Sequence, residues 1–236
     1  MLGTQLIKQA RAQKRLALDE KAGKAFLSEF HITVPSSTVV KDEKELEAQW
    51  SQFSPPVVLK VVSPDILHKS DVGGVKLSLQ NLEAVKAAMA LMKEQPGIKT
   101  AKVEGFLIEE MAPPGQEMVV GGYQDPQFGP MVMVGLGGIF VEILADVSFR
   151  ICPIDEQDAR QMLSELKAVA ILKGARGHPP VSMEAIVEVL MNIGGEQGLL
   201  MRYQHDIEAL DINPLLVSAT QAVAVDARII LRAHHE

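Results

Sequence analysis

The segment from Ser63 to Lys76, SPDILHKSDVGGVK, brings a histidine together with acidic and basic side chains and two glycines. His68 lies between Pro64 and the Gly73-Gly74 pair, a composition that is typical of a loop able to move as a unit. A neutral imidazole is a competent phosphoryl acceptor, and Lys69 beside it disfavours a second positive charge. His68 is therefore a candidate phosphoryl carrier, and the alternative is a solvent-exposed loop histidine.

Lys60 is the one ionisable residue in the apolar run VVLKVV. A lysine at the centre of a buried strand must reach the surface or meet an anion, because burying an ammonium group without a counter-charge is costly. A phosphate is a natural partner for it. The alternative is a lysine that extends from an edge strand into solvent.

The end of the chain predicts a hairpin whose strands are Ile207 to Val217 and Ala222 to Leu231. If the connection spans Ser218 to Gln221, Asn213 lies opposite Asp226. Opposed side chains in a sheet are about 5 Å apart, so these two could share one hard cation. A solvated outer face is the alternative.

The same pairing puts Asp211 opposite Arg228 and predicts an apolar second face. That face comprises Leu210, Ile212, Leu216, Val223, Val225 and Ile229. Pro214 is unusual in a central strand, and a bulge there would break the predicted register.

The elements that must position these residues alternate between strands and helices. Further strands are predicted at Ser37 to Val40, Val57 to Val62, Lys76 to Leu79, Gly105 to Met111, Glu117 to Tyr123, Met131 to Gly135, Phe140 to Leu144 and Phe149 to Ile154. Helices are predicted from Asp19-Glu20, over Glu43 to Phe53, from Asn81 to before Pro96, over Glu156 to Lys173 and over Ser182 to Ile193. This order predicts two mixed lobes, each a sheet with helices to one side, meeting near residue 113. The second lobe is expected to be antiparallel.

Composition excludes several classes of protein. The 236 residues carry a formal charge of -7, which argues against a nucleic-acid surface. The longest nearly apolar stretch, Gly129 to Val141, is too short for a membrane span, and the first thirty residues lack a signal-peptide core. The single cysteine, Cys152, fits a reducing compartment. We therefore expect a soluble cytoplasmic protein. The common phosphate-binding loop and the dinucleotide fingerprint are both missing, since Phe140 stands where that fingerprint requires a glycine.

Five segments follow one another in a consistent order between Leu18 and Leu231. They are PVVLKVVSPDILHKSDVGGVKL, VEGFLIEEMAPPGQEMVVGGYQDPQFGP, VGLGGIFVEILADVSFRICPI, ILKGARG and ALDINPLLV. Together they resemble the ATP-grasp β subunit of ADP-forming acetyl-CoA synthetase, in the NDP-forming acyl-CoA synthetase family that is related to succinyl-CoA synthetase β. The resemblance implies an α+β ATP-grasp fold with a nucleotide site between two lobes. One ATP-grasp domain, 1–236, would consist of a smaller N-terminal lobe of about 35–111 and a larger C-terminal lobe. The larger lobe would comprise about 112–236 plus the N-terminal helix, 1–34.

The reaction that the resemblance implies is reversible: acyl-CoA, ADP and phosphate give the free acid, CoA and ATP. A CoA-binding α subunit would make an acyl phosphate and pass its phosphoryl group to a histidine of its own. His68 would then carry that group to ADP with the help of Mg2+. An α2β2 assembly is implied, and acyl recognition would lie on the partner.

The resemblance also implies roles for individual residues. Lys60 matches the phosphate-binding lysine, and Asp211 matches an acidic residue that helps to receive the partner's phosphohistidine. The other nucleotide-binding positions are Gly73, Gly74, Lys76, Glu109, Glu110, Met111, Glu117 and, as the weakest candidate, Arg150. Asn213 and Asp226 match the magnesium positions.

Two other functions fit the same cleft. A stand-alone ATP-grasp ligase or kinase would use the nucleotide site without His68. A non-catalytic nucleotide-sensing module of a protein acetyltransferase system would bind ATP without phosphoryl exchange. Replacement of His68 separates these possibilities.

Overall fold

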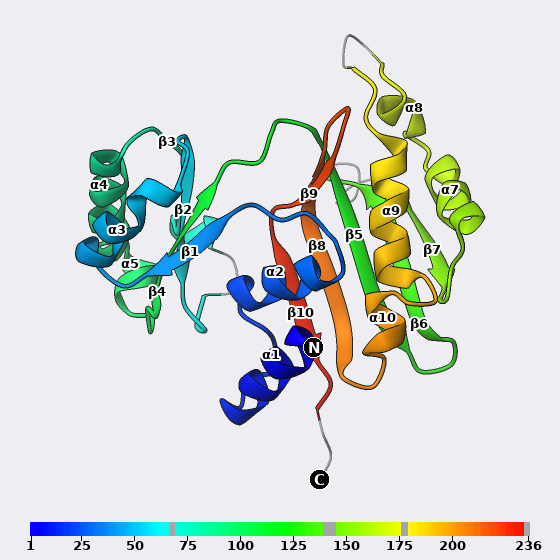
Figure 1. The fold of residues 1–236 in the computed structure, drawn as a ribbon, viewed down its shortest axis with the longest axis horizontal. Coiled ribbons are helices and arrows are strands. Elements are labelled where there is room, and N and C mark those ends of the chain that lie inside the picture. Colours follow the sequence, from blue (N-terminus) through cyan, green and yellow to red (C-terminus); the bar gives the residue numbers. More distant parts are fainter. Residues whose placement is uncertain (67–68, 139–144, 176–178, 234–236) are drawn as a thin grey trace. The chain divides into compact units, whose positions relative to one another are not determined.

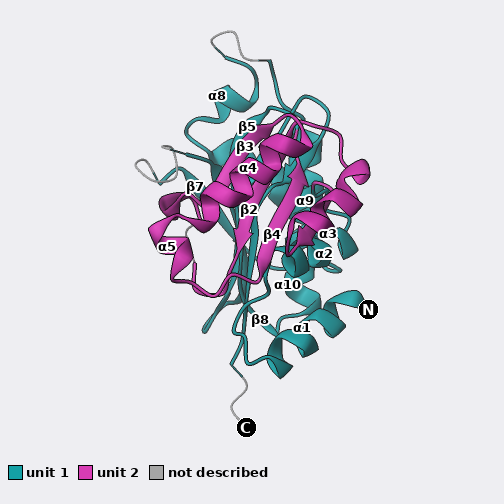
Figure 2. Cartoon of the chain, turned by 90° about the vertical axis from the view of Figure 1, so that its left-hand side faces the viewer, with its two compact units in different colours: residues 1–34, 113–236 teal, residues 35–112 magenta. Residues whose placement is uncertain are grey.

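The computed structural model describes residues 1–66, 69–138, 145–175 and 179–233 (Figure 1). The chain forms two compact units, drawn in two colours in Figure 2. Unit 1 comprises Met1–Val34 and Pro113–Glu236, and unit 2 comprises Pro35–Ala112. Over the described residues, no helix is both long enough and apolar enough to cross a membrane.

Unit 2 is an antiparallel sheet with helices packed on one side (Figures 1 and 2). Its strand order is β1 (Ser37–Val40), β4 (Gly105–Glu110), β2 (Val57–Val62) and β3 (Val75–Leu79). Its helices are α3 (Glu43–Gln49), α4 (Leu82–Lys93) and α5 (Pro96–Lys99), with the 3-10 turns η1 (Trp50–Gln52) and η2 (Ser70–Val72). The Asn81 side chain caps α4 by accepting a hydrogen bond from the Ala84 N–H, as its position in the sequence predicts.

Strand β2 is buried on both faces, which confirms the expectation from its continuous apolar run. Val57, Leu59 and Val61 face the helices and belong to the core of unit 2. Val58 and Lys60 alternate with them, and their exposed fractions are only 5% and 6%. A charged side chain therefore lies in the interior at the centre of this strand.

Unit 1 is built on a six-stranded antiparallel sheet, so the predicted antiparallel second lobe is confirmed. The strand order is β10 (Ala227–Leu231), β8 (Ile207–Val217), β5 (Gln116–Asp125), β6 (Gly129–Leu136) and β7 (Val147–Ile151), and β9 (Ala222–Ala224) also pairs with β8. The helices are α1 (Leu2–Ala12), α2 (Glu20–Glu29), α7 (Glu156–Glu165), α8 (Val169–Leu172), α9 (Met183–Gly194) and α10 (Leu199–Arg202). The strand predicted at Phe140 to Leu144 lies outside the described residues.

The helices of unit 1 cover one face of this sheet. A Cβ added at Gly194 of α9 would meet Val132 Cγ1 of β6 at 3.0 Å, and the Phe26 and Tyr203 rings join α2 to α10 at 4.9 Å. Figure 1 shows α9 covering the sheet and running roughly along its strands. We call the opposite face the open face; it carries Gly121, Tyr123, Met131, Met133, Phe149, Ile151, Ala209, Asp211, Arg228 and Ile230.

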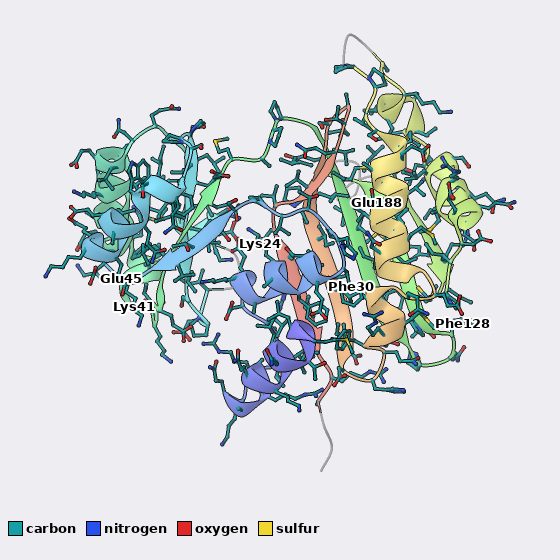
Figure 3. The ribbon with its side chains drawn as sticks, viewed as in Figure 1. Lys24, Phe30, Lys41, Glu45, Phe128 and Glu188 are labelled. Carbon is teal, nitrogen blue, oxygen red and sulfur yellow. The ribbon has the colours of Figure 1, made fainter. Side chains whose placement is uncertain are left out.

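The N-terminal part of the chain forms two helices, α1 and α2, where one N-terminal helix was expected over 1–34. The helix predicted to open at Asp19-Glu20 is α2. Between α1 and α2 the chain runs along the outer edge of β10, where the Leu18 N–H donates to the Ile229 carbonyl at 3.0 Å. Asp19 then caps α2 through the Ala22 N–H. On α2, Lys24, labelled in Figure 3, is buried and pairs with Glu20 at 3.0 Å. Because the residues between α1 and α2 hydrogen-bond to the edge of the sheet, they do not continue the helix.

The helix predicted over Glu156 to Lys173 is also broken, into α7 and α8. The buried Asp146 carboxylate accepts hydrogen bonds from the Lys167 N–H at 2.7 Å and the Ala168 N–H at 2.9 Å. These two amides are consequently bound to a side chain that lies far away in the sequence. The periodic pattern of apolar residues could not reveal this competing acceptor.

The last hairpin keeps the predicted register on both sides of Pro214, with Val217 opposite Ala222 and Asp211 opposite Arg228. The predicted apolar face is wrong between Pro214 and the turn of the hairpin. Leu215, Val217, Ala222 and Ala224 enter the core of unit 1 in place of Leu216, Val223 and Val225. The reason is that Val120 pairs with Ile212 whereas Met118 pairs with Leu215, so β8 has one extra residue opposite β5. The bulge thus reverses the faces without changing the register of the hairpin.

Candidate functional site

The buried Lys60 ammonium on β2 pairs with the Glu109 carboxylate on β4 at an Nζ to Oε1 distance of 3.1 Å. The side chains are 7% and 0% exposed. The anion expected for Lys60 is therefore present within the protein itself, as a carboxylate. In a buried pair of this kind, each charge offsets part of the desolvation cost of the other. Sequence reasoning assigned the two residues to separate contacts and missed their pairing.

A signal for this pairing exists in the sequence. Both VVLKVV and GFLIEE are apolar runs that contain ionisable residues, and β2 and β4 are antiparallel neighbours. Two ionisable groups of opposite charge in adjacent buried strands are expected to find each other. Strand order decides which pair forms, and the sequence pattern alone does not fix that order.

The two glycines before β3 each have a structural reason. Gly73 adopts φ 69°, a left-handed conformation that ends η2. A Cβ on Gly74 would lie 2.6 Å from Val61 Cγ1. The Gly74 N–H donates to the Lys69 carbonyl at 2.7 Å. This turn therefore anchors the chain directly after His68, which itself lies outside the described residues, and it leads into the exposed Lys76 on β3.

The residues at the end of β4 are held by backbone contacts within unit 2. The Ser54 N–H donates to Glu110 Oε1 at 3.0 Å, and the Glu110 N–H donates to the Ser36 carbonyl at 3.0 Å. Met111 follows, with 37% of its surface exposed. This segment is fixed in position while Met111 stays open to a ligand.

Glu117 lies at the start of β5, close to the glycine segment that follows β6. The Gly137 N–H donates to the Glu117 carbonyl at 2.8 Å. A Cβ on Gly137 would approach the Glu117 Cβ to 2.9 Å, so only glycine permits this approach. The glycines near residue 137 therefore allow two segments to lie in contact, and the side chain of Glu117 is exposed.

The open face of unit 1 brings polar residues from β8 and β10 together. Asp211 is paired with Arg228 in the sheet register, and both side chains are exposed. Asn213 and Asp226 lie between two pairs of the same register, Leu215 with Ala224 and Ile212 with Ala227. Asp226 Oδ1 accepts a hydrogen bond from the Ala227 N–H at 2.8 Å. The pairs on either side therefore place Asn213 and Asp226 at the same level of the hairpin, next to the Asp211–Arg228 pair.

Electrostatics connects two of these carboxylates. The pKa of Asp211 is raised from its ordinary value, first because neighbouring protein atoms desolvate the charged form and second because the Asp226 carboxylate repels it. The positive charge of Arg228 opposes this shift. Since Asp211 remains exposed in the isolated chain, its desolvation is partial. A cation bound near Asp226 would relieve the repulsion.

The donor set of this region fits Mg2+. Over the described residues no group of three His, Cys, Asp or Glu side chains is arranged to hold a metal. Mg2+ does not require one, because it commonly binds one or two protein oxygens together with waters and substrate phosphates. Asn213 and Asp226 offer an amide oxygen and a carboxylate for this purpose.

Arg150 does not join this group. Its neighbour in the sheet is Val132, on the face that the helices cover. Its guanidinium forms a two-pronged ion pair with the Glu165 carboxylate of α7, and Glu165 Oε2 also accepts from the Ser148 hydroxyl at 2.6 Å. Arg150 and Ser148 together hold the pKa of Glu165 at about 2. The structure therefore shows Arg150 attaching α7 to the edge of the sheet.

Comparison with known proteins places nearly the whole chain in the ATP-grasp family. The ATP-grasp domain model matches residues 9–231. The β subunit of acetate–CoA ligase [ADP-forming] I from Pyrococcus furiosus is 44% identical over 229 residues, which cover 96% of this chain and 97% of that subunit. The acetate–CoA ligase [ADP-forming] I of Archaeoglobus fulgidus is 39% identical over 210 residues, 89% of this chain but only 30% of that longer protein.

The fold is similar to solved structures of one archaeal enzyme, the dinucleotide-forming acetyl-coenzyme A synthetase 1 of Ca. Korarchaeum cryptofilum. Its complex with coenzyme A, Ca-AMPCP and HgCl+ aligns with a TM-score of 0.92 and 42% identity, covering 98% of this chain and 100% of the other. A second structure of it contains coenzyme A, acetyl-coenzyme A and a phosphorylated phosphohistidine segment. That structure aligns with a TM-score of 0.88 and 40% identity, with coverage of 98% and 100%.

Proposed function

This chain belongs to the ATP-grasp family of ADP-forming acetate–CoA ligase β subunits, and we propose on that basis that it is the nucleotide-binding subunit of an ADP-forming acyl-CoA synthetase. The overall reaction is acyl-CoA, ADP and phosphate to free acid, CoA and ATP, and it is reversible. The chain performs the half-reaction that makes or consumes ATP.

The observation that carries the proposal is the polar group on the open face of unit 1. Asp211 pairs with Arg228 near the start of β10, and Asn213 and Asp226 come just beyond the Ile212–Ala227 pair. The pKa of Asp211 is raised, first by desolvation and second by repulsion from the Asp226 carboxylate. Carboxylates that repel one another are suited to a ligand that brings positive charge. A purely structural hairpin has no need of this arrangement.

In the proposed mechanism His68 carries the phosphoryl group. A ring nitrogen of His68 takes it from the partner's phosphohistidine, while Asp211 helps to receive that phosphohistidine. The P–N bond at His68 then breaks as an oxygen of the ADP β-phosphate attacks the phosphorus, which gives ATP and a neutral imidazole. The phosphohistidine segment of the Ca. Korarchaeum cryptofilum enzyme supports this role. Gly73 and Gly74 form the anchored end of the loop that bears His68.

We assign the remaining nucleotide contacts by unit. In unit 2, Lys60 and Lys76 neutralise phosphate charge, and the segment Glu109, Glu110 and Met111 meets the adenine. In unit 1, Glu117 contacts the ribose, and Asn213 and Asp226 hold Mg2+. Mg2+ held there would supply positive charge that offsets the charge developing on the phosphate oxygens during transfer. Arg150 is the least supported phosphate contact, because it lies on the face that the helices cover and its guanidinium attaches to Glu165 of α7.

The partner in this proposal is a CoA-binding α subunit, and the assembly is α2β2. The Archaeoglobus fulgidus relative supports a lasting partnership, because there the matching region is 30% of one longer chain. The acid is bound by the partner. A cytoplasmic location fits the single cysteine, Cys152, whose pKa is raised to about 12 by burial.

The test is phosphorylation of the purified chain by γ-labelled ATP and magnesium. We expect acid-labile, base-stable label on His68, and loss of that label in His68→Asn with Mg-ATP binding retained in calorimetry. His205→Asn is the matched control, because it removes an exposed histidine of unit 1 and should keep the label.

Two results would contradict the proposal. Nucleotide binding without any label would favour a sensing module. ATP turnover with a carboxylate substrate that persists in His68→Asn would favour a stand-alone ligase.

A further inference from the structure

The open face of unit 1 carries an exposed group of apolar side chains that the proposed chemistry does not use. We call it the apolar cluster: Tyr123, Met131, Met133, Phe149 and Ile151. Tyr123, Phe149 and Ile151 are 37%, 43% and 49% exposed. The Tyr123 and Phe149 rings meet edge to face at 6.5 Å, and the Tyr123 hydroxyl lies 3.3 Å from Met131 Sδ. The cluster is thus a packed group and not a set of scattered side chains.

The apolar cluster is continuous with Asp211. One row of the sheet runs from Asp211 on β8 through Gly121 on β5 and Met133 on β6 to Phe149 on β7. Gly121 has no side chain, and a Cβ there would lie 3.2 Å from Met133 Cε. The Met133 side chain therefore extends over Gly121 toward β8. Only a glycine separates the cluster from the carboxylate in this row.

Exposed aromatic and methionine side chains on a sheet face are costly in a chain that acts alone. Contiguous apolar patches of this kind mark protein interfaces, which are enriched in Tyr, Phe and Met. Among the described strands, β7 is the last in the sheet order. An edge strand that displays Phe149 and Ile151 is a site for unwanted association unless it is covered. Across the described residues, the helices of unit 1 pack on the other face.

We propose that the apolar cluster is the docking surface for the CoA-binding partner subunit, which rests on the proposed function. Phosphoryl transfer requires the partner to bring its phosphohistidine to Asp211 while water is excluded. A partner bound to the apolar cluster lies over the row of the sheet that contains Asp211. Subunit docking and delivery of the phosphohistidine to Asp211 therefore use one surface. The Asp211 and Arg228 charges at the border fix the orientation of docking.

A second copy of this chain is a poorer occupant. If two copies of the chain bound each other through the apolar cluster, each copy would cover the Asp211 row of the other. The same contact would bring the exposed Asp211 carboxylates of the two copies toward each other. Association of this kind would block the transfer that the face serves.

The test measures the affinity of the full-length chain for its cognate CoA-binding subunit by calorimetry. The double variant Tyr123→Ser/Phe149→Ser removes both rings, and we expect the affinity to fall about tenfold or more, as for buried aromatic anchors. Phe128→Ser is the matched control. Phe128, labelled in Figure 3, is 56% exposed but lies in the turn between β5 and β6, so its removal should leave the affinity unchanged.

Two further measurements separate this inference from the proposed function. Mg-ADP binding and His68 labelling by the chain alone should be the same in the double variant as in the wild type, which also shows that it folds. Oxidative footprinting should show Tyr123 and Met131 protected by the partner. Unchanged partner affinity in a variant that still binds Mg-ADP overturns the docking surface alone. A concentration-dependent dimer of the wild-type chain that the double variant abolishes overturns it in favour of self-association.

Discussion

At the scale of the residue, the Lys60–Glu109 pair shows how a side chain can serve both folding and binding. The pair is buried between two strands of unit 2, so neither charge can turn to water when the other is removed. Buried ion pairs contribute little net stability, yet the loss of one partner is expensive. The lysine that we assign to phosphate is thus held in place by a carboxylate.

We predict that Lys60→Met lowers the free energy of unfolding by about 3 to 5 kcal/mol, because Glu109 loses its buried counter-charge. The double variant Lys60→Met/Glu109→Met should recover most of this loss while Mg-ADP binding stays weak. Urea unfolding followed by fluorescence measures both, because Trp50, the single tryptophan, packs against the core of unit 2.

The control is Lys44→Met on the exposed surface of α3, for which we expect a change below about 0.5 kcal/mol. Equal destabilisation of the single and double variants would show that the pair does not act as a unit.

The raised pKa of Asp211 gives a prediction about pH. A carboxyl whose pKa is higher in the folded than in the unfolded chain disfavours folding when it is ionised. Asp211→Asn should therefore raise the free energy of unfolding at pH 7.5. The gain should shrink as the pH falls through the raised pKa and disappear below the ordinary value of 3.8.

Thermal unfolding measured between pH 3 and pH 8 checks this dependence. Glu208→Gln on the same strand should show no gain, because Arg232 pairs with that carboxylate at 3.2 Å. A stability difference for Asp211→Asn that did not vary with pH would contradict the assignment.

At the scale of the element, Asp146 determines where α7 ends. Its carboxylate binds two backbone amides that a continuous helix would use internally. We predict that Asp146→Ala lowers the free energy of unfolding by about 1 to 3 kcal/mol, because two partly buried donors lose their acceptor. Hydrogen exchange should show faster exchange at Lys167 and Ala168.

The comparison is Asp155→Ala, which removes the N-terminal cap of α7 and should cost only about 1 kcal/mol. If the amides of residues 167 and 168 kept their protection in Asp146→Ala, the carboxylate would not be what interrupts the helix.

The bulge in β8 changes which of its residues face the core. Alternation of apolar residues predicts the faces of a strand only while the pairing is regular. The extra residue between Ile212 and Leu215 reverses the faces, although the turn at Ser218 still sets the register. The positions of Asp211 and Arg228 were therefore predictable, and the core role of Leu215 was not.

At the scale of the whole molecule, the two units differ in the number of chain segments that form them. Unit 2 uses one continuous segment, Pro35–Ala112, whereas unit 1 joins residues from both ends of the chain. The Leu18 N–H donates to the Ile229 carbonyl, which closes the sheet of unit 1 across most of the sequence. Unit 1 therefore requires both ends of the chain, and the apolar cluster on its open face provides the surface that we assign to the partner.

The sequence by itself predicted most of the described strands and several of the longer helices, because buried strands and capped helices carry their patterns locally. Val57–Val62, Ser37–Val40 and Ile207–Val217 have the bounds that their residues predict. Order and spacing of motifs also determined the family. Only the tertiary structure decided that Glu109 pairs with Lys60, that Asp146 interrupts a helix and that Arg150 lies on the covered face. These contacts join residues far apart in the chain, and their partners depend on strand order and packing, which local patterns do not encode.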